Sequence, residues 1–180
     1  MITNIDFAIL DFIAEYFRCG FLDAVVPVVT SLGNGGWFWI ALAVVLLIPK
    51  KTRKFGVSMA FALILDLILC NLTLKPLVGR IRPYDVRSGI DLLIEAPHDY
   101  SFPSGHTAAS FAAAGALLFM KARGKIPAMI LAAVIGLTRL YLYVHYPTDV
   151  VCGALLGIFC GFIGAVLTKN IPFFREKTGK

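Results

Sequence analysis

The sequence predicts an all-α fold, a polytopic bundle of transmembrane helices with five clear spans and a further helical segment at the N-terminus. Of its 180 residues, 58% are hydrophobic and 16% are charged, whereas soluble domains carry about 25% charged residues. Apolar runs long enough to cross a hydrocarbon core of about 30 Å recur along the chain. Most Lys and Arg residues fall between these runs. We expect one integral membrane domain and no separate soluble domain.

The N-terminal segment, residues 1–33, is amphipathic. Its apolar residues are mixed with charged ones, which are Asp6, Asp11, Glu15 and Arg18. This pattern favours a helix at the membrane interface, or a helix pair with residues 21–32. The alternative is a polar first span that completes a bundle of six helices. The acidic residues also argue against a cleavable signal peptide, which begins with basic residues.

Five spans follow within the predicted membrane domain, residues 34–170. Their approximate ranges are 35–50, 55–74, 104–120, 126–143 and 148–168. The last span carries Gly153, Gly157 and Gly161 at four-residue intervals, which permits close packing on a neighbouring helix. We expect that neighbour to belong to the same chain, and the oligomeric state is left open. Residues 171–180 form a basic tail on the cytoplasmic side.

Basic residues predict the orientation of the spans. The segments after the first, third and fifth spans hold 11 of the 17 Lys and Arg residues but only Glu176 of the 11 acidic residues. An excess of Lys and Arg marks the cytoplasmic face. The basic residues concerned are Lys50, Lys51, Arg53, Lys54, Lys121, Arg123, Lys125, Lys169, Arg175, Lys177 and Lys180. Loop 75–103 and the turn before the fifth span are therefore expected on the extracytoplasmic face.

The four cysteines, Cys19, Cys70, Cys152 and Cys160, give no sign of a metal site in the sequence. The last three lie within apolar runs, and none has the spacing of metal ligands. We interpret them as small buried hydrophobic residues. We expect neither a metal ion nor another cofactor.

Three polar clusters share the expected extracytoplasmic face. They are KPLVGRIRP at residues 75–83, PSGH at 103–106 and TRLYLYVHYPTD at 138–149. Taken singly, a histidine at a helix end is usually structural or solvated, and an arginine at a span end usually reaches toward lipid headgroups. Because all three clusters fall on one face in one compartment, we interpret them as one site.

The charged residues of these clusters predict a site for phosphate. Lys75, Arg82 and Arg139 supply three positive charges, and guanidinium groups match the spacing of phosphate oxygens. Ser104 and Gly105 open a helix, where free backbone N–H groups and the helix dipole attract an anion. Such a site needs no metal ion to bind phosphate.

Two histidines and a carboxylate add the groups for phosphoryl transfer. Pro147 separates His145 from Asp149 and is expected to open the fifth span, with Asp149 in its first turn. A carboxylate there can hold one imidazole nitrogen of His145 and leave the other free to attack phosphorus. His106, from another helix, can protonate the leaving oxygen. The set predicts transfer through a phosphohistidine intermediate.

Further polar residues are candidates for accessory roles. Arg80 and Arg87 either extend the site toward a second phosphate or are solvated. Asp66 lies inside the second span, where a carboxylate is costly. It either orients a neighbour in a polar network or is protonated and structural. Loop 84–100 is expected to influence the choice of headgroup through Tyr84, Glu95 and His98.

The order and spacing of these residues resemble the type 2 phosphatidic acid phosphatase (PAP2) superfamily. The matching pattern is Lys, six residues and Arg-Pro; then Pro-Ser-Gly-His; then Arg, five residues, His, three residues and Asp. It runs from Lys75 to Asp149. One position departs, since Thr138 precedes Arg139 where the family usually has Ser. Thr138 keeps the hydroxyl group, so we expect a small effect.

The resemblance implies a role for each residue of the three motifs. The implied phosphate-binding residues are Lys75, Arg82, Ser104, Gly105 and Arg139. His106 is the implied acid, His145 the implied nucleophile and Asp149 its partner. These implied roles agree with the chemistry expected from the residue types.

The resemblance also implies an activity, with residues 34–170 as the catalytic domain. The chain is similar to small bacterial enzymes that dephosphorylate undecaprenyl diphosphate at the outer face of the plasma membrane. Phosphatases of phosphatidylglycerophosphate and phosphatidate look much the same at this level, and transfer of phosphate to another lipid or glycan is chemically close. The expected partners are the bilayer and a lipid phosphate, and no nucleic acid.

Two other classes fit less well. Vanadium haloperoxidases resemble the same anion site, but they are soluble, and five apolar spans argue against them. A non-enzymatic transporter would place charged residues along a path through the membrane. Here they gather at one face, with Asp66 as the main exception.

Overall fold

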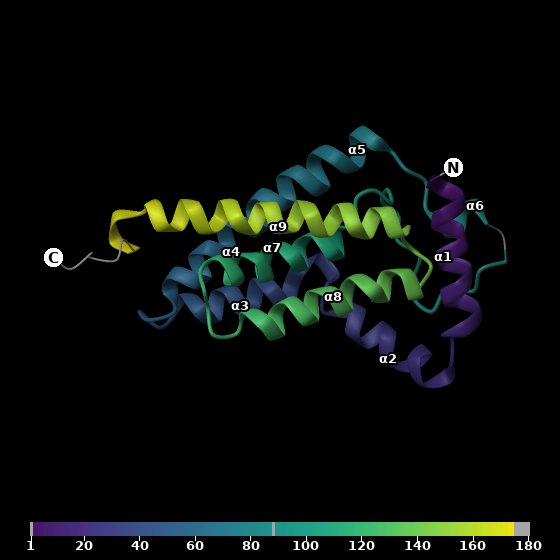
Figure 1. The fold of residues 1–180 in the computed structure, drawn as a ribbon, viewed down its shortest axis with the longest axis horizontal. Coiled ribbons are helices and arrows are strands. Elements are labelled where there is room, and N and C mark those ends of the chain that lie inside the picture. The colour runs from purple at the N-terminus through teal and green to yellow at the C-terminus, as the bar shows by residue number, and fades with distance from the viewer. Residues whose placement is uncertain (1, 88, 175–180) are drawn as a thin grey trace.

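The computed structural model describes residues 2–87 and 89–174, and this part of the chain forms helices and no strands (Figure 1). The all-α prediction is confirmed. In chain order the helices are α1 (Ile2–Tyr16), α2 (Gly20–Ser31), the 3-10 turn η1 (Asn34–Gly36), α3 (Trp37–Leu47), α4 (Arg53–Asp66), the π-helical η2 (Leu67–Leu74), α5 (Lys75–Val78), α6 (Pro83–Val86), α7 (Gly105–Phe119), α8 (Lys125–Tyr141), α9 (Pro147–Asn170) and η3 (Pro172–Phe174).

Two helical segments of the described chain are long and apolar enough to cross a membrane, Arg53–Val86 and Pro147–Asn170. α2 and the helical stretch Asn34–Leu47 pass the same test only as a pair, which is bent by 43°. α7 and α8 have 15 and 17 residues, fewer than the roughly 20 that an α-helix needs to cross a bilayer. By length and composition the structure gives two spans, or three with the bent pair, and five are not confirmed.

The longer helices run lengthwise beside one another, and α7 packs against α4, α8 and α9 (Figure 1). The side of α7 that faces these helices consists mainly of buried alanines, which let neighbouring backbones approach closely. A Cβ atom added at Gly157 of α9 would lie 2.3 Å from the carbonyl oxygen of Ala108. Gly153, Gly157 and Gly161 therefore pack against α7 of the same chain, as predicted.

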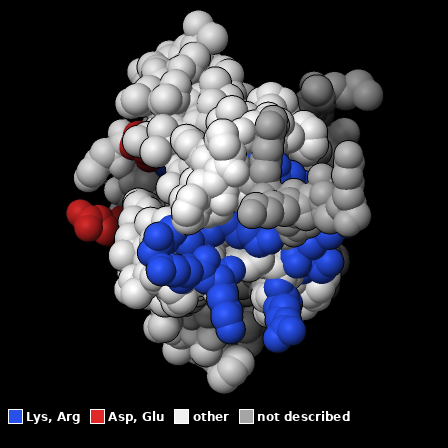
Figure 2. All heavy atoms as spheres, turned by 90° about the vertical axis from the view of Figure 1, so that its left-hand side faces the viewer, with Lys and Arg blue, Asp and Glu red and all other residues white. Residues whose placement is uncertain are grey.

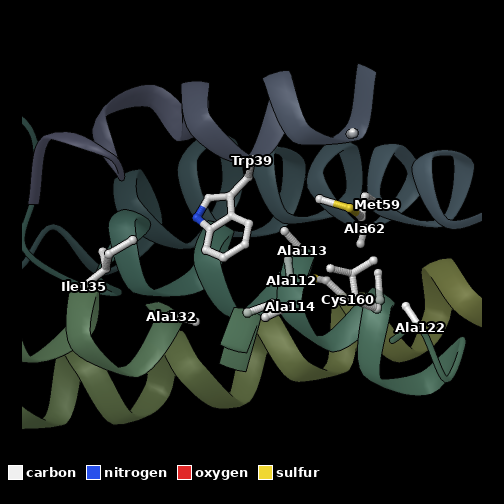
Figure 3. Packing of buried hydrophobic residues seen from close by; sticks show 14 residues of the cluster. Trp39, Met59, Ala62, Ala112, Ala113, Ala114, Ala122, Ala132, Ile135 and Cys160 are labelled. Atoms are coloured by element: carbon white, nitrogen blue, oxygen red, sulfur yellow. The ribbon is translucent and has the colours of Figure 1, made fainter. Parts of the chain in front are cut away.

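The core lies between α3, α4, α7, α8 and α9 (Figure 3). Trp39 extends from α3 toward the alanines of α7, and its indole Nε1 donates a hydrogen bond of 2.9 Å to Oγ of Ser110. Cys70 and Cys160 are buried, as expected for small hydrophobic residues. Cys152 is only half-buried and Cys19 is exposed, so the burial expected of all four cysteines is wrong for these two.

The N-terminal segment contains two helices, α1 and α2, of which α2 forms the bent apolar pair with the stretch Asn34–Leu47. α1 lies across the end of the bundle (Figure 1), and Leu10 is fully buried in a cluster with Leu140 and Tyr146. Other apolar residues of α1, such as Ile5 and Phe12, are exposed. This helix therefore presents one face to the protein and another to its surroundings.

The two ends of the bundle differ in charge. Lys and Arg gather on the end that carries the α3–α4 turn, the α7–α8 turn and the end of α9 (Figure 2). Lys51, Lys121 and Arg123 line one hollow there, and Lys169 lies beside Lys121 in another. Four of the charged residues assigned to this face lie outside the described residues; they are Arg175, Glu176, Lys177 and Lys180.

Candidate active site

The three polar clusters meet at the opposite end of the bundle, beside α1 (Figure 1). The loop after α5 brings Arg82, the start of α7 brings Ser104, and the turn between α8 and α9 brings His145. All three side chains are buried, with His145 only 1% exposed. The sequence motifs therefore form one enclosed polar site at the end of an apolar bundle.

Lys75 and Arg82 converge on one point next to His145. Nη2 of Arg82 donates to Oδ1 of Asp99 at 2.6 Å, and the ammonium group of Lys75 pairs with Oδ2 of the same carboxylate. Nη1 of Arg82 donates to the carbonyl oxygen of Val144 at 2.7 Å and lies 3.2 Å from Nε2 of His145. Two of the predicted phosphate-binding cations are thus already shared by one anionic group.

That anionic group, Asp99, was not among the predicted site residues. Burial raises the pKa of its carboxyl, but the hydrogen bond and charge of Lys75 and the charge of Arg82 outweigh burial and lower the pKa to about 2. Its side chain is 53% exposed, and its carbonyl oxygen accepts from Nε of Arg82 at 2.8 Å. The only sequence signal was its place in the loop that leads into the PSGH motif.

The N-terminus of α7 lies against the same cations. A Cβ atom added at Gly105 would lie 3.2 Å from Oδ1 of Asn71 and 3.6 Å from Nζ of Lys75. Glycine therefore allows the start of α7 to approach Lys75 closely. The backbone N–H groups of the first helical turn have no partner within the helix, so this end of α7 offers donors beside the ammonium group of Lys75.

Arg139 and His106 are held by the last turn of α2 and by η1, respectively. Nη1 of Arg139 donates to Oγ1 of Thr30 at 2.7 Å, while its buried Nε has no hydrogen-bond partner among the described residues. Nε2 of His106 lies 2.8 Å from Oδ1 of Asn34. Thr30 and Asn34 were missed, because nothing in their local sequence points to residues more than 70 positions away.

Asp149 lies near His145, but a serine stands between them. Nδ1 of His145 is 3.6 Å from Oδ2 of Asp149, which is too long for a hydrogen bond. Oγ of Ser101 donates to that oxygen at 2.5 Å and lies 3.5 Å from Nδ1. The backbone N–H of Tyr146 also donates to Oδ2, at 3.0 Å. Sequence reasoning missed Ser101, which begins SFPSGH but lies outside the motif.

The surroundings of His145 favour a neutral imidazole with an unprotonated Nε2. Burial lowers its pKa to about 3, and the charges of Arg82 and Arg139 act in the same direction while Asp149 opposes them. A guanidinium group can only donate, so Nε2, which faces Arg82, carries the lone pair. Nδ1 then carries the proton and faces Ser101 and Asp149. This is the protonation state that a nucleophilic histidine needs.

Arg80 and Arg87 are both paired with carboxylates of the protein. Its Nη1 donates to Oδ1 of Asp149 at 2.6 Å and to Oγ1 of Thr148 at 2.7 Å. Its Nη2 donates to Oδ2 of Asp6 at 2.8 Å. Arg87 likewise pairs with Asp11, at 2.6 Å. Each of these arginines is therefore bound to a carboxylate of α1. Arg87 is also 47% exposed, which agrees with the predicted alternative that it is solvated.

The remaining accessory candidates lie around the site. The hydroxyl of Tyr84 donates to the carbonyl oxygen of Pro97 at 2.7 Å and ties loop 84–100 together. Oγ1 of Thr138 donates to the carbonyl oxygen of Ile135 at 2.5 Å, within its own helix. Asp66 is buried, and its Oδ1 has no partner among the described residues. Glu95 and His98 are exposed.

A cavity of about 580 Å³ opens from this site between α3, α4 and α7. Its apolar lining includes Ile40, Val44 and Leu63. Its polar lining includes Lys75 and His106, together with Asp66, Asn71 and Asp99. The cavity therefore suits a molecule with an anionic end and an apolar body.

The chain is similar in sequence to known proteins. Residues 53–172 match the PAP2 superfamily. The chain is 29% identical over 161 residues to an undecaprenyl-diphosphatase of Sulfolobus acidocaldarius, covering 88% of this chain and 76% of that protein. It is 34% identical over 168 residues to a lipid A 4'-phosphatase of Bacteroides thetaiotaomicron, covering 83% and 75%.

Two solved structures share the fold. A transmembrane PAP2-type phosphatidylglycerolphosphate phosphatase from Bacillus subtilis gives a TM-score of 0.78 at 26% identity, covering 97% of this chain and 89% of the other. Aquifex aeolicus LpxE gives 0.76 at 31% identity, covering 88% and 93%. The similarity thus includes the helices around the motifs as well as the motifs themselves.

Proposed function

Since the chain belongs to the PAP2 superfamily, we propose that it is a membrane lipid phosphate phosphatase that acts through a phosphohistidine on His145. The observation that carries this proposal is the position of Nε2 of His145, which is 3.2 Å from Nη1 of Arg82. A neutral imidazole nitrogen beside converging cations fits attack on a bound phosphate.

The proposed reaction has two steps. Nε2 of His145 forms a bond to phosphorus while the bond from phosphorus to the leaving oxygen breaks, and His106 gives its proton to that oxygen. Water then attacks phosphorus, returns a proton to His106 and releases phosphate as the Nε2–phosphorus bond breaks. Lys75, Arg82 and Arg139 stabilise the charge on the phosphoryl oxygens in both steps.

Substrate binding requires the phosphate to replace a carboxylate. Lys75 and Arg82 are paired with Asp99, so the phosphate takes over these contacts from Asp99. Ser104 and Gly105 supply donors at the start of α7. Asp149 acts on Nδ1 of His145 through Ser101 and stabilises the charge that the ring gains on attack.

The proposed substrate is a polyprenyl diphosphate, of which undecaprenyl diphosphate is the first choice. Relatives named undecaprenyl-diphosphatase, from Sulfolobus acidocaldarius and Bacillus subtilis, support it. The apolar cavity beside the cations suits a lipid tail. Phosphatidylglycerophosphate is the second candidate, supported by the structural similarity to a phosphatase of that class.

The proposed setting is a bacterial plasma membrane with residues 34–170 as a multi-pass catalytic domain and five spans. The gathering of Lys and Arg at the end remote from the site (Figure 2) supports a cytoplasmic position for that end. The active site then faces the extracytoplasmic side. Reaction without a metal ion is part of this proposal.

Phosphate release by the purified protein in detergent tests the proposal. Wild type, His145→Ala and Arg123→Ala are each given undecaprenyl diphosphate, phosphatidate or phosphatidylglycerophosphate, with EDTA present. Arg123 lies at the basic end of the bundle, remote from the site, which makes it a control. We expect release by wild type and Arg123→Ala, and none by His145→Ala. Loss of release on adding EDTA would contradict metal independence, and release only with an added acceptor would indicate phosphotransfer.

A further inference from the structure

Asp6 of α1 is a buried carboxylate that the proposed reaction does not use. Its exposed fraction is 1%, although apolar residues of the same helix, such as Ile5 and Phe12, are exposed. A carboxylate is rarely this buried unless its oxygens are paired. The groups that pair with these oxygens therefore indicate the role of Asp6.

The oxygens of Asp6 bind Arg80, which also contacts Asp149, and Thr148, which precedes Asp149 in the chain. Oδ2 accepts from Nη2 of Arg80 and from Oγ1 of Thr148, each at 2.8 Å. Oδ1 accepts from the backbone N–H of Thr148 at 3.1 Å. Thr148 belongs to the first turn of α9, so Asp6 caps that helix from outside and places a negative charge at its N-terminus.

Arg80 binds two carboxylates, Asp6 and Asp149, which are far apart in the sequence. One side of its guanidinium fork holds Asp6 and the other holds Oδ1 of Asp149, at 2.6 Å. The guanidinium also stacks on the ring of Tyr146, 3.7 Å from the centroid. Its backbone oxygen accepts from the N–H of Ser101 at 2.8 Å. Arg80 is thus fixed on several sides, and Asp6 fixes the side remote from His145.

We propose that Asp6 is a positioning residue, which holds Arg80 and the first turn of α9 so that Asp149 keeps Oδ2 for Ser101 and His145. This inference rests on the proposed function of His145. Without the charge of Asp6, both sides of the guanidinium fork are free to turn toward Asp149. Arg80 then competes with Ser101 for Oδ2, and the link from Asp149 to Nδ1 of His145 weakens.

Asp11 of the same helix provides a matched control. Its Oδ1 accepts from the hydroxyl of Tyr143 at 2.7 Å, and its Oδ2 pairs with Arg87 at 2.6 Å. Asp11 therefore fastens α1 to the same end of the bundle, but these hydrogen bonds reach Tyr143 and Arg87 and not Arg80 or α9. Asp11→Asn removes the same charge from the same helix as Asp6→Asn.

Steady-state kinetics of both variants with the preferred lipid test the inference. We expect kcat of Asp6→Asn to fall by about 10-fold or more, because small displacements of reacting groups cost this much. We expect KM to stay within about twofold, since the phosphate-binding cations are untouched. Asp11→Asn should keep kcat within about twofold. The double variant Asp6→Asn/Arg80→Gln should have a kcat no lower than that of Arg80→Gln alone, because both changes remove the same ion pair between Asp6 and Arg80.

Several results would overturn the inference. These are a wild-type kcat in Asp6→Asn, equal losses in Asp6→Asn and Asp11→Asn, or losses that multiply in the double variant. Failure of the proposed function would instead abolish release by wild type itself, so the two failures are distinguishable. If Asp6→Asn does not fold, Arg80→Lys takes its place, because one ammonium group cannot span both carboxylates as the fork does; a wild-type kcat there would also overturn the inference.

Discussion

At the residue scale, the site is organised around anions that belong to the protein. Asp99 forms ion pairs with Lys75 and Arg82. Asp6 and Asp149 both form ion pairs with Arg80. Each cation near His145 is therefore oriented before any substrate arrives, except that the Nε of Arg139 has no partner among the described residues. Orientation in advance lowers the cost of arranging charges during the reaction.

Replacing Asp99 tests whether it competes with phosphate. Because its lowered pKa keeps the carboxyl charged at any working pH above about 2, it opposes a second anion throughout that range. We expect Asp99→Asn to lower the inhibition constant for inorganic phosphate by about 3-fold to 10-fold, since solvent screens this half-exposed pair. Glu95→Gln, in the same loop, should leave the constant unchanged. A weaker inhibition by phosphate in Asp99→Asn would show that Asp99 only orients the cations.

The sequence predicted the residues of the motifs but not the residues that hold them. Lys75, Arg82 and His145 were predictable because their residue types and spacing match one chemistry. Ser101, Asn34 and Asp6 contact the site from positions with no periodic or motif signal, and the pairs they form are separated by 44 to 142 residues. Such contacts depend on how the helices pack, which a local pattern does not contain.

At the element scale, the site depends on the contact between α7 and α9. α7 begins beside Ser104 and α9 carries Asp149 in its first turn, and the N–H of Ser104 donates to the carbonyl oxygen of Asp149 at 3.1 Å. Small residues along both helices allow this close approach. Displacement of one helix would therefore separate the phosphate donors from the partner of His145.

Gly157→Ala tests this dependence. The added Cβ would lie 2.3 Å from a backbone oxygen of α7, so a helix must shift. We expect a loss of about 1–3 kcal/mol in stability, as is usual for overpacked cores, measured by thermal unfolding in detergent, with a parallel loss of phosphate release. Gly124→Ala is the control, because a Cβ there meets nothing within 4 Å. Equal melting temperatures for the two variants would contradict the packing described.

The predicted helix boundaries agree best with the structure where residues typical of a helix N-terminus mark the start. α9 begins at Pro147 and α7 at Gly105, each within one residue of the expected 148 and 104. The expected span 55–74 instead consists of α4 followed by the π-helical η2. Hydrophobic periodicity does not distinguish α from π winding, so this break could not be predicted.

At the scale of the whole molecule, the bundle has a basic end and a catalytic end. The sequence predicted this division from the positions of Lys and Arg, and the arrangement in space agrees with it for the described residues (Figure 2). The membrane positions of the short helices α7 and α8 are not given by their lengths. Neighbouring helices bury most of α7, so α7 need not satisfy the length rule for a helix exposed to lipid. α8 instead leaves Ile126, Ile130 and Leu137 exposed along one face.

Single cysteines in a background without Cys19, Cys70, Cys152 and Cys160 test the orientation. We expect Glu95→Cys to react with a membrane-impermeant thiol reagent in intact cells, because loop 84–100 belongs to the catalytic end. Lys51→Cys, at the basic end, should react only after the membrane is opened. Labelling of Lys51→Cys in intact cells would reverse the proposed topology.

The most direct test of the central claim is the covalent intermediate itself. Wild-type protein is mixed with undecaprenyl diphosphate labelled in the terminal phosphate, with EDTA present, quenched within milliseconds at alkaline pH and digested. The account predicts label on the peptide that contains His145, and none in His145→Ala. Label on His106, or steady phosphate release with no labelled protein at any time, would contradict it.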